Sequence, residues 1–143
     1  MNMTLDPRLA ADTHPLGRLD DCLLLIAKNA LFPWFILVPE TQEIEFYKLD
    51  SQQQGRLQQH INAVSGFIEG YFSTDKINIA SIGNIVSQLH IHVIGRRQDD
   101  ACWPGVVWGT SQFKAYEKPT LDAIKSRLGP ALGDSFRPAE DVG

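Results

Sequence analysis

The chain has 143 residues, 43% of them hydrophobic, which suits one folded domain with a buried core and excludes a disordered chain. Its net charge of -4 gives no basic surface for nucleic acid, and its 2 cysteines are too few for a disulfide framework. The sequence has no signal-like apolar stretch near its start and no run of roughly 18–20 apolar residues. We therefore expect a cytoplasmic protein without nucleic-acid or membrane partners.

The first third of the chain contains short apolar runs separated by proline-containing connectors. A weak signal favours a short helix at residues 7–11. Residues 22–27 and 34–38 are apolar runs of the length and flanking composition that neighbouring antiparallel strands show. Cys22, within the first run, is expected in the core. Residues 44–47 are predicted as a further short strand or edge segment.

A long helix is predicted over residues 51–72. Its apolar side chains recur at helical intervals, namely Leu57, Ile61, Val64, Ile68, Tyr71 and Phe72. Ser51, with Gln54 three positions later, resembles a capping box. His60 falls on a position of this helix that looks polar.

The second half begins with two further predicted strands. Residues 76–81 alternate apolar with polar or small residues, Gly83-Asn84 marks a turn, and a strand with two histidines follows. The order of strands, one long helix and more strands indicates an α+β fold, with helices on a mostly antiparallel sheet. A short helix is expected over residues 120–128, and a frayed tail beyond Gly133.

The segment Gln88-Leu89-His90-Ile91-His92-Val93-Ile94 holds half of the 4 histidines of the chain. Its alternation predicts a strand with Gln88, His90 and His92 on one face. Side chains two residues apart on a strand lie about 6.5–7 Å apart along it. Two imidazoles at this spacing are suited to act on adjacent atoms of one small substrate.

The residues alone leave three interpretations of these imidazoles. They could be structural, although a buried sheet face favours aliphatic groups because each buried polar atom needs a partner. They could bind zinc, but no second motif organises further ligands, so no metal is assigned. They could perform phosphoryl chemistry, with one neutral imidazole as nucleophile and a protonated neighbour as acid. Backbone N–H groups of the turn at residues 83–85 would then receive phosphate oxygens.

This segment resembles the motif of the histidine-triad (HIT) superfamily of nucleotide hydrolases and transferases, His-φ-His-φ-His-φ-φ with φ apolar. Gln88, His90 and His92 occupy the three histidine positions. Upstream residues also fall close to the family pattern, namely Asn78, Gly83, Asn84 and Val86. Weaker matches follow in order, at Leu37-Val38-Pro39, Gly95-Arg96 and Trp103-Pro104-Gly105, so the resemblance covers roughly residues 20–110.

The resemblance implies a single HIT-like domain over residues 1–143, with its core at about 20–110 and a C-terminal extension at 111–143. It implies a mostly antiparallel sheet of about five strands with one long helix, and usually a homodimer. The implied substrate is an α-phosphate-linked nucleotide, with a purine nucleoside expected, of the dinucleoside polyphosphate or nucleoside phosphoramidate type. No cofactor or catalytic metal is implied.

The resemblance also implies roles for individual residues. His90 would attack the α-phosphorus and form a nucleotidyl-histidine that water resolves, while His92 would contact the phosphate and assist the leaving group. Phosphate oxygens would be held by Asn78 and by the turn formed by Gly83, Asn84 and Ile85.

Two departures from the family pattern leave an alternative open. Gln88 stands where the first triad histidine belongs, and a glutamine forms hydrogen bonds but does not ionise. In the connector after residue 27, Lys28-Asn29 occupies the region where an acidic residue usually binds ribose hydroxyls, so Asn29 would have to serve. The alternative is a nucleotide-binding or regulatory protein of the same fold with weak or lost catalysis.

Overall fold

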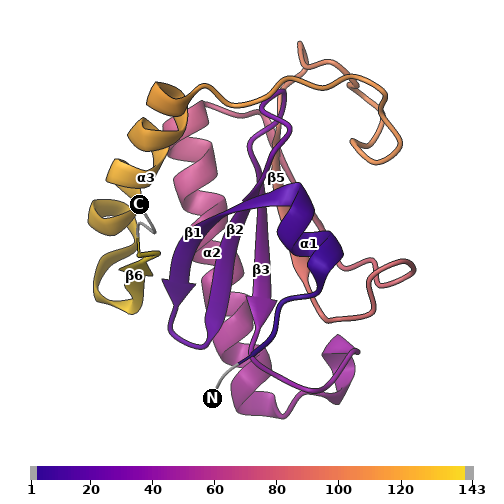
Figure 1. Cartoon of the computed structure of the whole chain (residues 1–143), viewed down its shortest axis with the longest axis vertical. Coiled ribbons are helices and arrows are strands. Elements are labelled where there is room, and N and C mark those ends of the chain that lie inside the picture. The colour runs from indigo at the N-terminus through magenta and orange to yellow at the C-terminus, as the bar shows by residue number, and fades with distance from the viewer. Residues whose placement is uncertain (1–2, 141–143) are drawn as a thin grey trace.

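A six-stranded antiparallel sheet forms the centre of the computed structural model, which describes residues 3–140 (Figure 1). Its strands lie in the order β4-β5-β3-β2-β1-β6, and each neighbouring pair is antiparallel. The strands are β1 (Thr13–Leu19), β2 (Cys22–Ala27), β3 (Trp34–Pro39), β4 (Lys76–Ala80), β5 (Ile91–Arg96) and β6 (Phe136–Pro138). The predicted α+β fold class is confirmed.

Three α-helices accompany the sheet within the described residues, namely α1 (Pro7–Asp12), α2 (Ser51–Phe72) and α3 (Lys118–Leu132). Two 3₁₀ turns, η1 (Phe46–Lys48) and η2 (Gly133–Ser135), connect elements. Among residues 3–140, no helix has the length and apolar character needed to cross a bilayer.

The start of α2 differs from the predicted capping box. Asp50 is the N-cap, and its carboxylate accepts a hydrogen bond from the Gln53 backbone N–H at 2.8 Å. The side chain of Gln54 reaches back to the Leu49 carbonyl at 2.8 Å, rather than to the backbone N–H of the cap. The predicted bounds of the helix are nevertheless confirmed, because its apolar stripe is unbroken.

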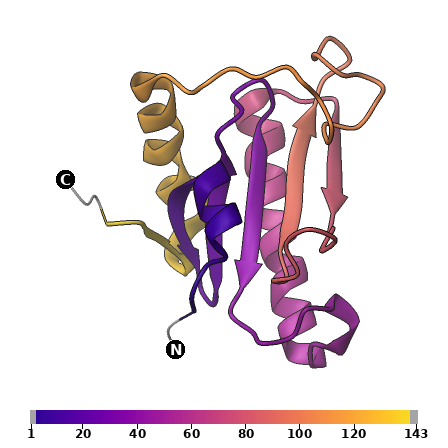
Figure 2. The same cartoon turned by 45° about the vertical axis from the view of Figure 1, so that its right-hand side comes forward.

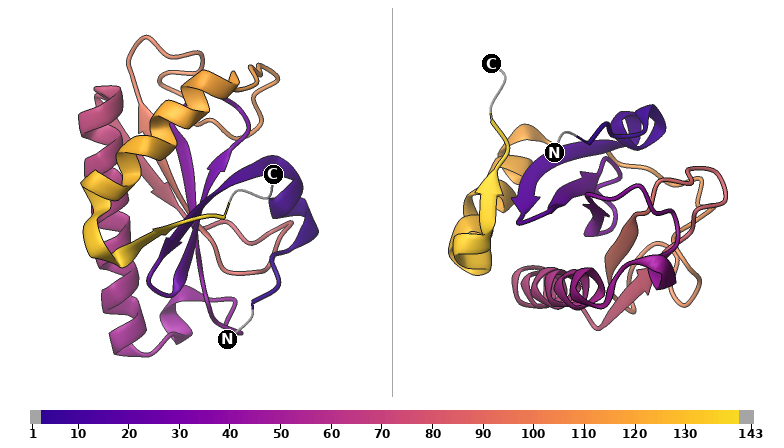
Figure 3. Two further views of the ribbon diagram at one scale, coloured as in Figure 1. Left: turned by 60° about the vertical axis from the view of Figure 1, so that its left-hand side comes forward. Right: turned by 90° about the horizontal axis from the view of Figure 1, so that it is seen from below.

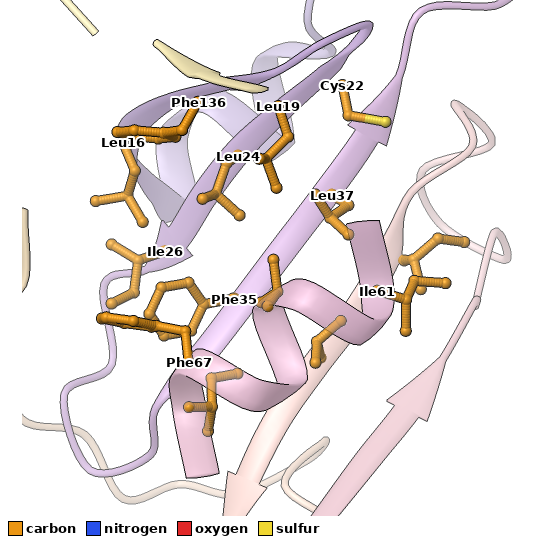
Figure 4. Packing of buried hydrophobic residues seen from close by; sticks show 14 of the residues in the cluster. Leu16, Leu19, Cys22, Leu24, Ile26, Phe35, Leu37, Ile61, Phe67 and Phe136 are labelled. Carbon is orange, nitrogen blue, oxygen red and sulfur yellow. The ribbon is translucent and has the colours of Figure 1, made fainter. Parts of the chain in front are cut away.

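The two faces of the sheet are covered differently. Helices α2 and α3 lie on one face and the short α1 lies on the other (Figures 2 and 3). The main core fills the α2 face, where residues from strands and helix interleave, among them Leu24, Phe35, Leu37, Ile61 and Phe67 (Figure 4). Because side chains alternate along a strand, Ile36 and Val38 of β3 point to the opposite face and pack with Leu9 of α1. The two histidines belong to this second face.

Close contact between β5 and α2 depends on Gly95. A Cβ at this position would lie 2.5 Å from Ile68 Cγ2 and 2.8 Å from Pro33 Cγ, so a larger residue would push helix and strand apart. Gly95 follows the histidine-bearing part of β5, and its small size therefore fixes the position of that strand on the helix.

The N- and C-terminal parts contain strands that the sequence did not indicate. Strand β1 was not predicted because Pro15 and several polar residues interrupt its apolar pattern. The frayed tail predicted beyond Gly133 is wrong for residues 133–140: η2 and β6 form there, and β6 pairs with β1. Gly17 of β1 permits this pairing, since its φ is +155° and a Cβ would lie 2.2 Å from the Arg137 carbonyl oxygen.

Two internal predictions also need correction. Residues 44–47 are not a strand, because the chain turns through η1 before α2 begins. The predicted histidine strand starts later than expected: β5 begins at Ile91, so Gln88 and His90 precede it and are free to leave the regular alternation. The helix predicted over 120–128 is confirmed in place but is longer, as α3 extends over Lys118–Leu132.

Candidate active site

His92 is positioned by the pairing of β3 with β5. His92 lies opposite Ile36, and Trp34 lies opposite Ile94, so Trp34 and His92 share a face as diagonal neighbours. Trp34 Nε1 donates a hydrogen bond to His92 Nδ1 at 2.9 Å. An indole nitrogen only donates, so Nδ1 of His92 must be the acceptor. The neutral ring therefore carries its proton on Nε2.

His90 has the opposite tautomer. Its Nδ1 lies 2.7 Å from the backbone carbonyl oxygen of Gln88, which only accepts, so Nδ1 carries the proton. Nε2 of the neutral ring then holds a free lone pair, the form that a nucleophile requires. The His90 and His92 rings lie edge to face, with centroids 4.9 Å apart. The predicted meeting of the two imidazoles on one side of the sheet is confirmed.

Both histidines are largely shielded from solvent, with exposed fractions of 4% for His90 and 7% for His92. Burial, and secondarily the charge of His90, lowers the pKa of His92 to about 4. His92 is therefore neutral at pH 7 in the free protein. Burial disfavours the imidazolium form, and the role of His92 as a proton donor to a bound substrate stays a prediction.

The side chain of Gln88 does not join the two rings as predicted. Its Oε1 accepts a hydrogen bond from the Asp6 backbone N–H at 2.8 Å, and its Nε2 donates to the Thr4 carbonyl at 3.1 Å. Gln88 thus fastens the segment that precedes α1 beside the site. A cleft of about 430 Å³ lies next to this contact, lined by residues 3–7, 41–44, 87 and 88.

Asn78 of β4 contacts a buried ion pair instead of an open site. Arg96, only 2% exposed, donates to the Asn78 side-chain oxygen at 3.0 Å. The same guanidinium binds both carboxylate oxygens of Asp100 at 2.8 and 3.0 Å. The oxygen of Asn78 is thereby occupied, which leaves its amide nitrogen as the group that could meet a phosphate.

Asp100 also organises the loop that follows β5. Burial alone would raise the pKa of its carboxyl, but hydrogen bonds from Arg96 and from backbone N–H groups, including those of Cys102 and Trp103, lower it to about 2. Farther along this loop, Trp108 packs edge-on against His92 and Trp34, with ring centroids 5.1 and 5.7 Å away. The loop therefore builds one wall of the histidine site.

The remaining predicted site residues lie in two other segments. Asn29 uses its side chain to hold the segment near residue 113: its oxygen accepts from the Leu31 and Lys114 backbone N–H groups, and its nitrogen donates to the Gln112 carbonyl. Residues 83–85 form an exposed loop, and Ile85 is 79% exposed. The structure thus brings together His90, His92 and the carbonyl of Gln88, and it places Asn29 in a structural contact.

Sequence reasoning missed the aromatic partners of His92. The sequence assigned no role to Trp34 or Trp108, because tryptophan buries large area in most proteins and usually serves packing. The residues around Trp34 in its own strand do not indicate that it belongs to a functional site. Only the register between β3 and β5, which aligns it with His92, reveals its hydrogen bond.

The HIT domain family matches residues 8–99, more than half of the chain, and the protein therefore belongs to this family. It is similar to the crystal structure of a histidine triad protein from Bradyrhizobium japonicum (38% identity, TM-score 0.87, covering 91% of this chain and 98% of that chain). It is also similar to a histidine triad protein from Marinobacter aquaeolei VT8 (42% identity, TM-score 0.85, covering 90% of this chain and 95% of that chain). A third similar structure is a histidine triad protein from Sinorhizobium meliloti 1021 (36% identity, TM-score 0.85, covering 89% of this chain and 95% of that chain). No curated protein matches the sequence. Members of the family are typically nucleotide hydrolases and transferases.

Proposed function

We propose that the protein is a nucleotide hydrolase or transferase that acts on α-phosphate-linked nucleotides, with His90 as nucleophile and Gln88 in the place of the first triad histidine. The hydrogen bond from His90 Nδ1 to the Gln88 carbonyl, at 2.7 Å, carries this proposal. It fixes the tautomer in which Nε2 is unprotonated, and a neutral imidazole is an effective nucleophile near pH 7. Family membership supports the substrate class.

In the proposed reaction, the lone pair of His90 Nε2 forms a bond to the α-phosphorus. The bond from phosphorus to the leaving group breaks, and its electron pair departs with the oxygen or nitrogen of that group. Water then attacks the phosphorus of the nucleotidyl-histidine, which releases the nucleoside monophosphate and returns His90 to its neutral form. In a transferase, another acceptor takes the place of water.

His92 would serve this reaction through its Nε2–H. The Trp34 hydrogen bond occupies Nδ1, so Nε2–H is the group left to donate to a phosphate oxygen. A neutral His92 donates through Nε2–H without a proton on Nδ1, so the Trp34 hydrogen bond is kept when a phosphate binds. This Nε2–H would stabilise the negative charge on the phosphate and assist the leaving group by a hydrogen bond. The amide nitrogen of Asn78 and the backbone of residues 83–85 are the proposed contacts for the remaining phosphate oxygens.

The nucleotidyl-histidine provides a direct test. The protein is mixed with adenosine 5′-phosphoramidate, quenched in denaturant and digested, and peptides are analysed by mass spectrometry. An adenylyl group on the peptide that contains His90, absent from a His90→Ala variant that keeps the circular dichroism spectrum of the wild type, is the expected result. Wild-type kcat in the His90→Ala variant would remove His90 from the mechanism.

The burial of the site favours a second candidate function, nucleotide binding with weak or lost catalysis. Exposed fractions of 4% and 7% leave the two rings little access to a substrate unless neighbouring segments move. Calorimetry with AMP, run beside the phosphoramidate assay, separates the two functions. Binding without turnover supports the second candidate, and turnover that depends on His90 supports the enzyme.

We further propose that two copies associate through β4. This strand is an outer strand of the sheet, and Ile79 on it is 53% exposed, as is usual for a surface that a second chain covers. Ile82 and Ile85, in the segment that follows β4, are also exposed. An Ile79→Lys variant should halve the mass measured by light scattering. The C-terminal extension is proposed to be part of the same domain, because Ile124 and Phe136 are buried in the main core.

A further inference from the structure

A second cluster of chemically active side chains lies on the α2 face of the sheet, away from the histidine pair. It joins the turn between β1 and β2 to the middle of α2. Asp21 precedes β2, Cys22 is its first residue, and His60 lies in α2. The carboxylate of Asp21, the thiol of Cys22 and the imidazole of His60 place their ligand atoms within 4.8 Å of one another.

His60 is the unusual member of this cluster. The sequence predicted a polar, outward position, but the residue is only 6% exposed. Its Nε2 is buried and has no hydrogen-bond partner among the described residues. A buried polar atom without a partner costs about 1–3 kcal/mol, so this nitrogen needs a physical explanation.

The distances around Nε2 fit a shared metal ion better than direct hydrogen bonds. Nε2 lies 3.6 Å from Asp21 Oδ1 and 3.7 Å from Asp20 Oδ2, while the Cys22 thiol donates a hydrogen bond to the same Asp21 oxygen at 3.8 Å. The nitrogen–oxygen distances are too long for hydrogen bonds. Zinc–ligand bonds of about 2.0–2.3 Å in a tetrahedral arrangement place neighbouring ligand atoms about 3.3–3.7 Å apart.

Charge and orientation also favour a cation at this place. Two carboxylates and a thiol face one buried imidazole, and the donor set of nitrogen, sulfur and oxygen suits zinc rather than magnesium or calcium. Arg56 contacts the other oxygen of Asp21, Oδ2, at 3.4 Å. This contact leaves Oδ1 directed at His60, as outer partners of metal ligands commonly do.

We propose that Asp21 Oδ1, Cys22 Sγ and His60 Nε2 bind a structural Zn²⁺ ion. The ion would fasten the β1–β2 turn to α2. On binding, the Cys22 thiol loses its proton to solvent, since zinc is bound by the thiolate. This site is separate from the proposed reaction at His90.

Co²⁺ is the first probe, because a thiolate-bound Co²⁺ has a charge-transfer absorption and a tetrahedral one has strong visible bands. The full-length protein, stripped with a chelator, is titrated with Co²⁺ and then with Zn²⁺. We expect one Co²⁺ per chain, a thiolate band that Cys22→Ser abolishes, and displacement by Zn²⁺. Cys102→Ser, which changes the other free cysteine, is the matched control and should keep the band.

Thermal unfolding with and without Zn²⁺ provides a second measurement, independent of activity. Zn²⁺ should raise the Tm of the wild type and leave that of His60→Gln and Asp21→Asn unchanged, because an ion that binds only the folded state stabilises it. Asp21 is partly exposed, so we expect its variant to fold even if the buried changes at Cys22 and His60 impair folding. Equal Zn²⁺ affinity in wild type and Asp21→Asn, or Co²⁺ binding without a thiolate band, would overturn the proposal.

Discussion

Trp34 and His92 are joined by a hydrogen bond across the β3–β5 pair, with indole Nε1 donating to imidazole Nδ1 at 2.9 Å. This bond selects one tautomer of His92 and one orientation of its ring. A residue from a neighbouring strand therefore decides which nitrogen of His92 faces a substrate. Trp34 acts as a positioning residue in the proposed reaction, since its contact is with His92.

The Trp34→Phe variant tests this role. Phenylalanine keeps most of the packing but cannot donate a hydrogen bond, so the Nδ1–H tautomer becomes populated and the pKa of His92 rises. Loss of one hydrogen bond, about 0.5–1.5 kcal/mol, should lower kcat by up to about tenfold. Nitrogen-15 NMR of the histidine side chains follows the tautomer directly. Trp108→Phe keeps the Trp34 bond, and it should retain the wild-type tautomer; equal tautomer populations in both variants would remove Trp34 from this role.

The low pKa of His92 predicts a specific pH dependence of stability. Between the ordinary histidine pKa of about 6.5 and the native value of about 4, the unfolded chain binds a proton that the folded protein does not. Stability contributed by neutral His92 is thus complete above pH 6.5 and is lost as the pH falls toward 4, by about 3 kcal/mol in all. Urea unfolding of wild type and His92→Gln across this range measures the effect. The difference in unfolding free energy between wild type and His92→Gln should shrink as the pH falls from 6.5 to 4. A difference that does not change with pH would contradict the prediction.

The contact between Gln88 and the N-terminal segment should be visible in amide exchange. The Gln88→Ala variant loses the acceptor for the Asp6 N–H and the donor to the Thr4 carbonyl. We expect faster hydrogen exchange at the Asp6 amide and a loss of about 1–2 kcal/mol of unfolding free energy. Gln59→Ala, on the exposed side of α2, is the control and should change neither quantity. Unchanged exchange at Asp6 in Gln88→Ala would show that other contacts hold the segment.

Two adjacent ion pairs offer a matched comparison of buried and exposed charge. Arg96 and Asp100 have side chains that are 2% and 7% exposed, whereas the pair formed by Arg97 and Asp99 is 50% and 71% exposed. Asp100→Asn leaves a buried guanidinium without its counter-ion and should cost about 3–5 kcal/mol. Asp99→Asn should cost less than about 1 kcal/mol. Denaturant unfolding measures both, and similar costs would show that burial is not what makes the Asp100 pair important.

The elements predicted correctly are those whose own residues show an apolar pattern with clear boundaries. Helix α2 was predicted to its ends, since six apolar side chains mark one stripe along it. The strands at 22–27 and 34–38 were predicted within a residue because proline and polar residues bound them. Strand β6 was missed, because three residues have no periodicity and form a strand only by pairing with β1.

The site was predictable only in part, for a related reason. His90 and His92 share one segment, so their spacing alone indicated that they meet. The partners of each site residue come from elsewhere: Trp34 from another strand, Thr4 and Asp6 from the N-terminal segment. Such contacts depend on strand register and loop path, which one sequence does not specify. The burial of His60 was missed because a neighbouring turn, rather than its own helix, covers it.

The outer strands of the sheet have unequal capacity to accept another chain. Strand β6 has 3 residues and includes Pro138, which lacks an N–H group, so this side offers almost no ladder for a further strand. Strand β4 has 5 residues and an unpaired side. Growth of the sheet by edge-to-edge addition is thus confined to one direction. In a dimer joined at β4, the β4 edge of each copy would be paired with the other copy. No open β4 edge would then remain for a further chain, which protects the protein against extension into fibres.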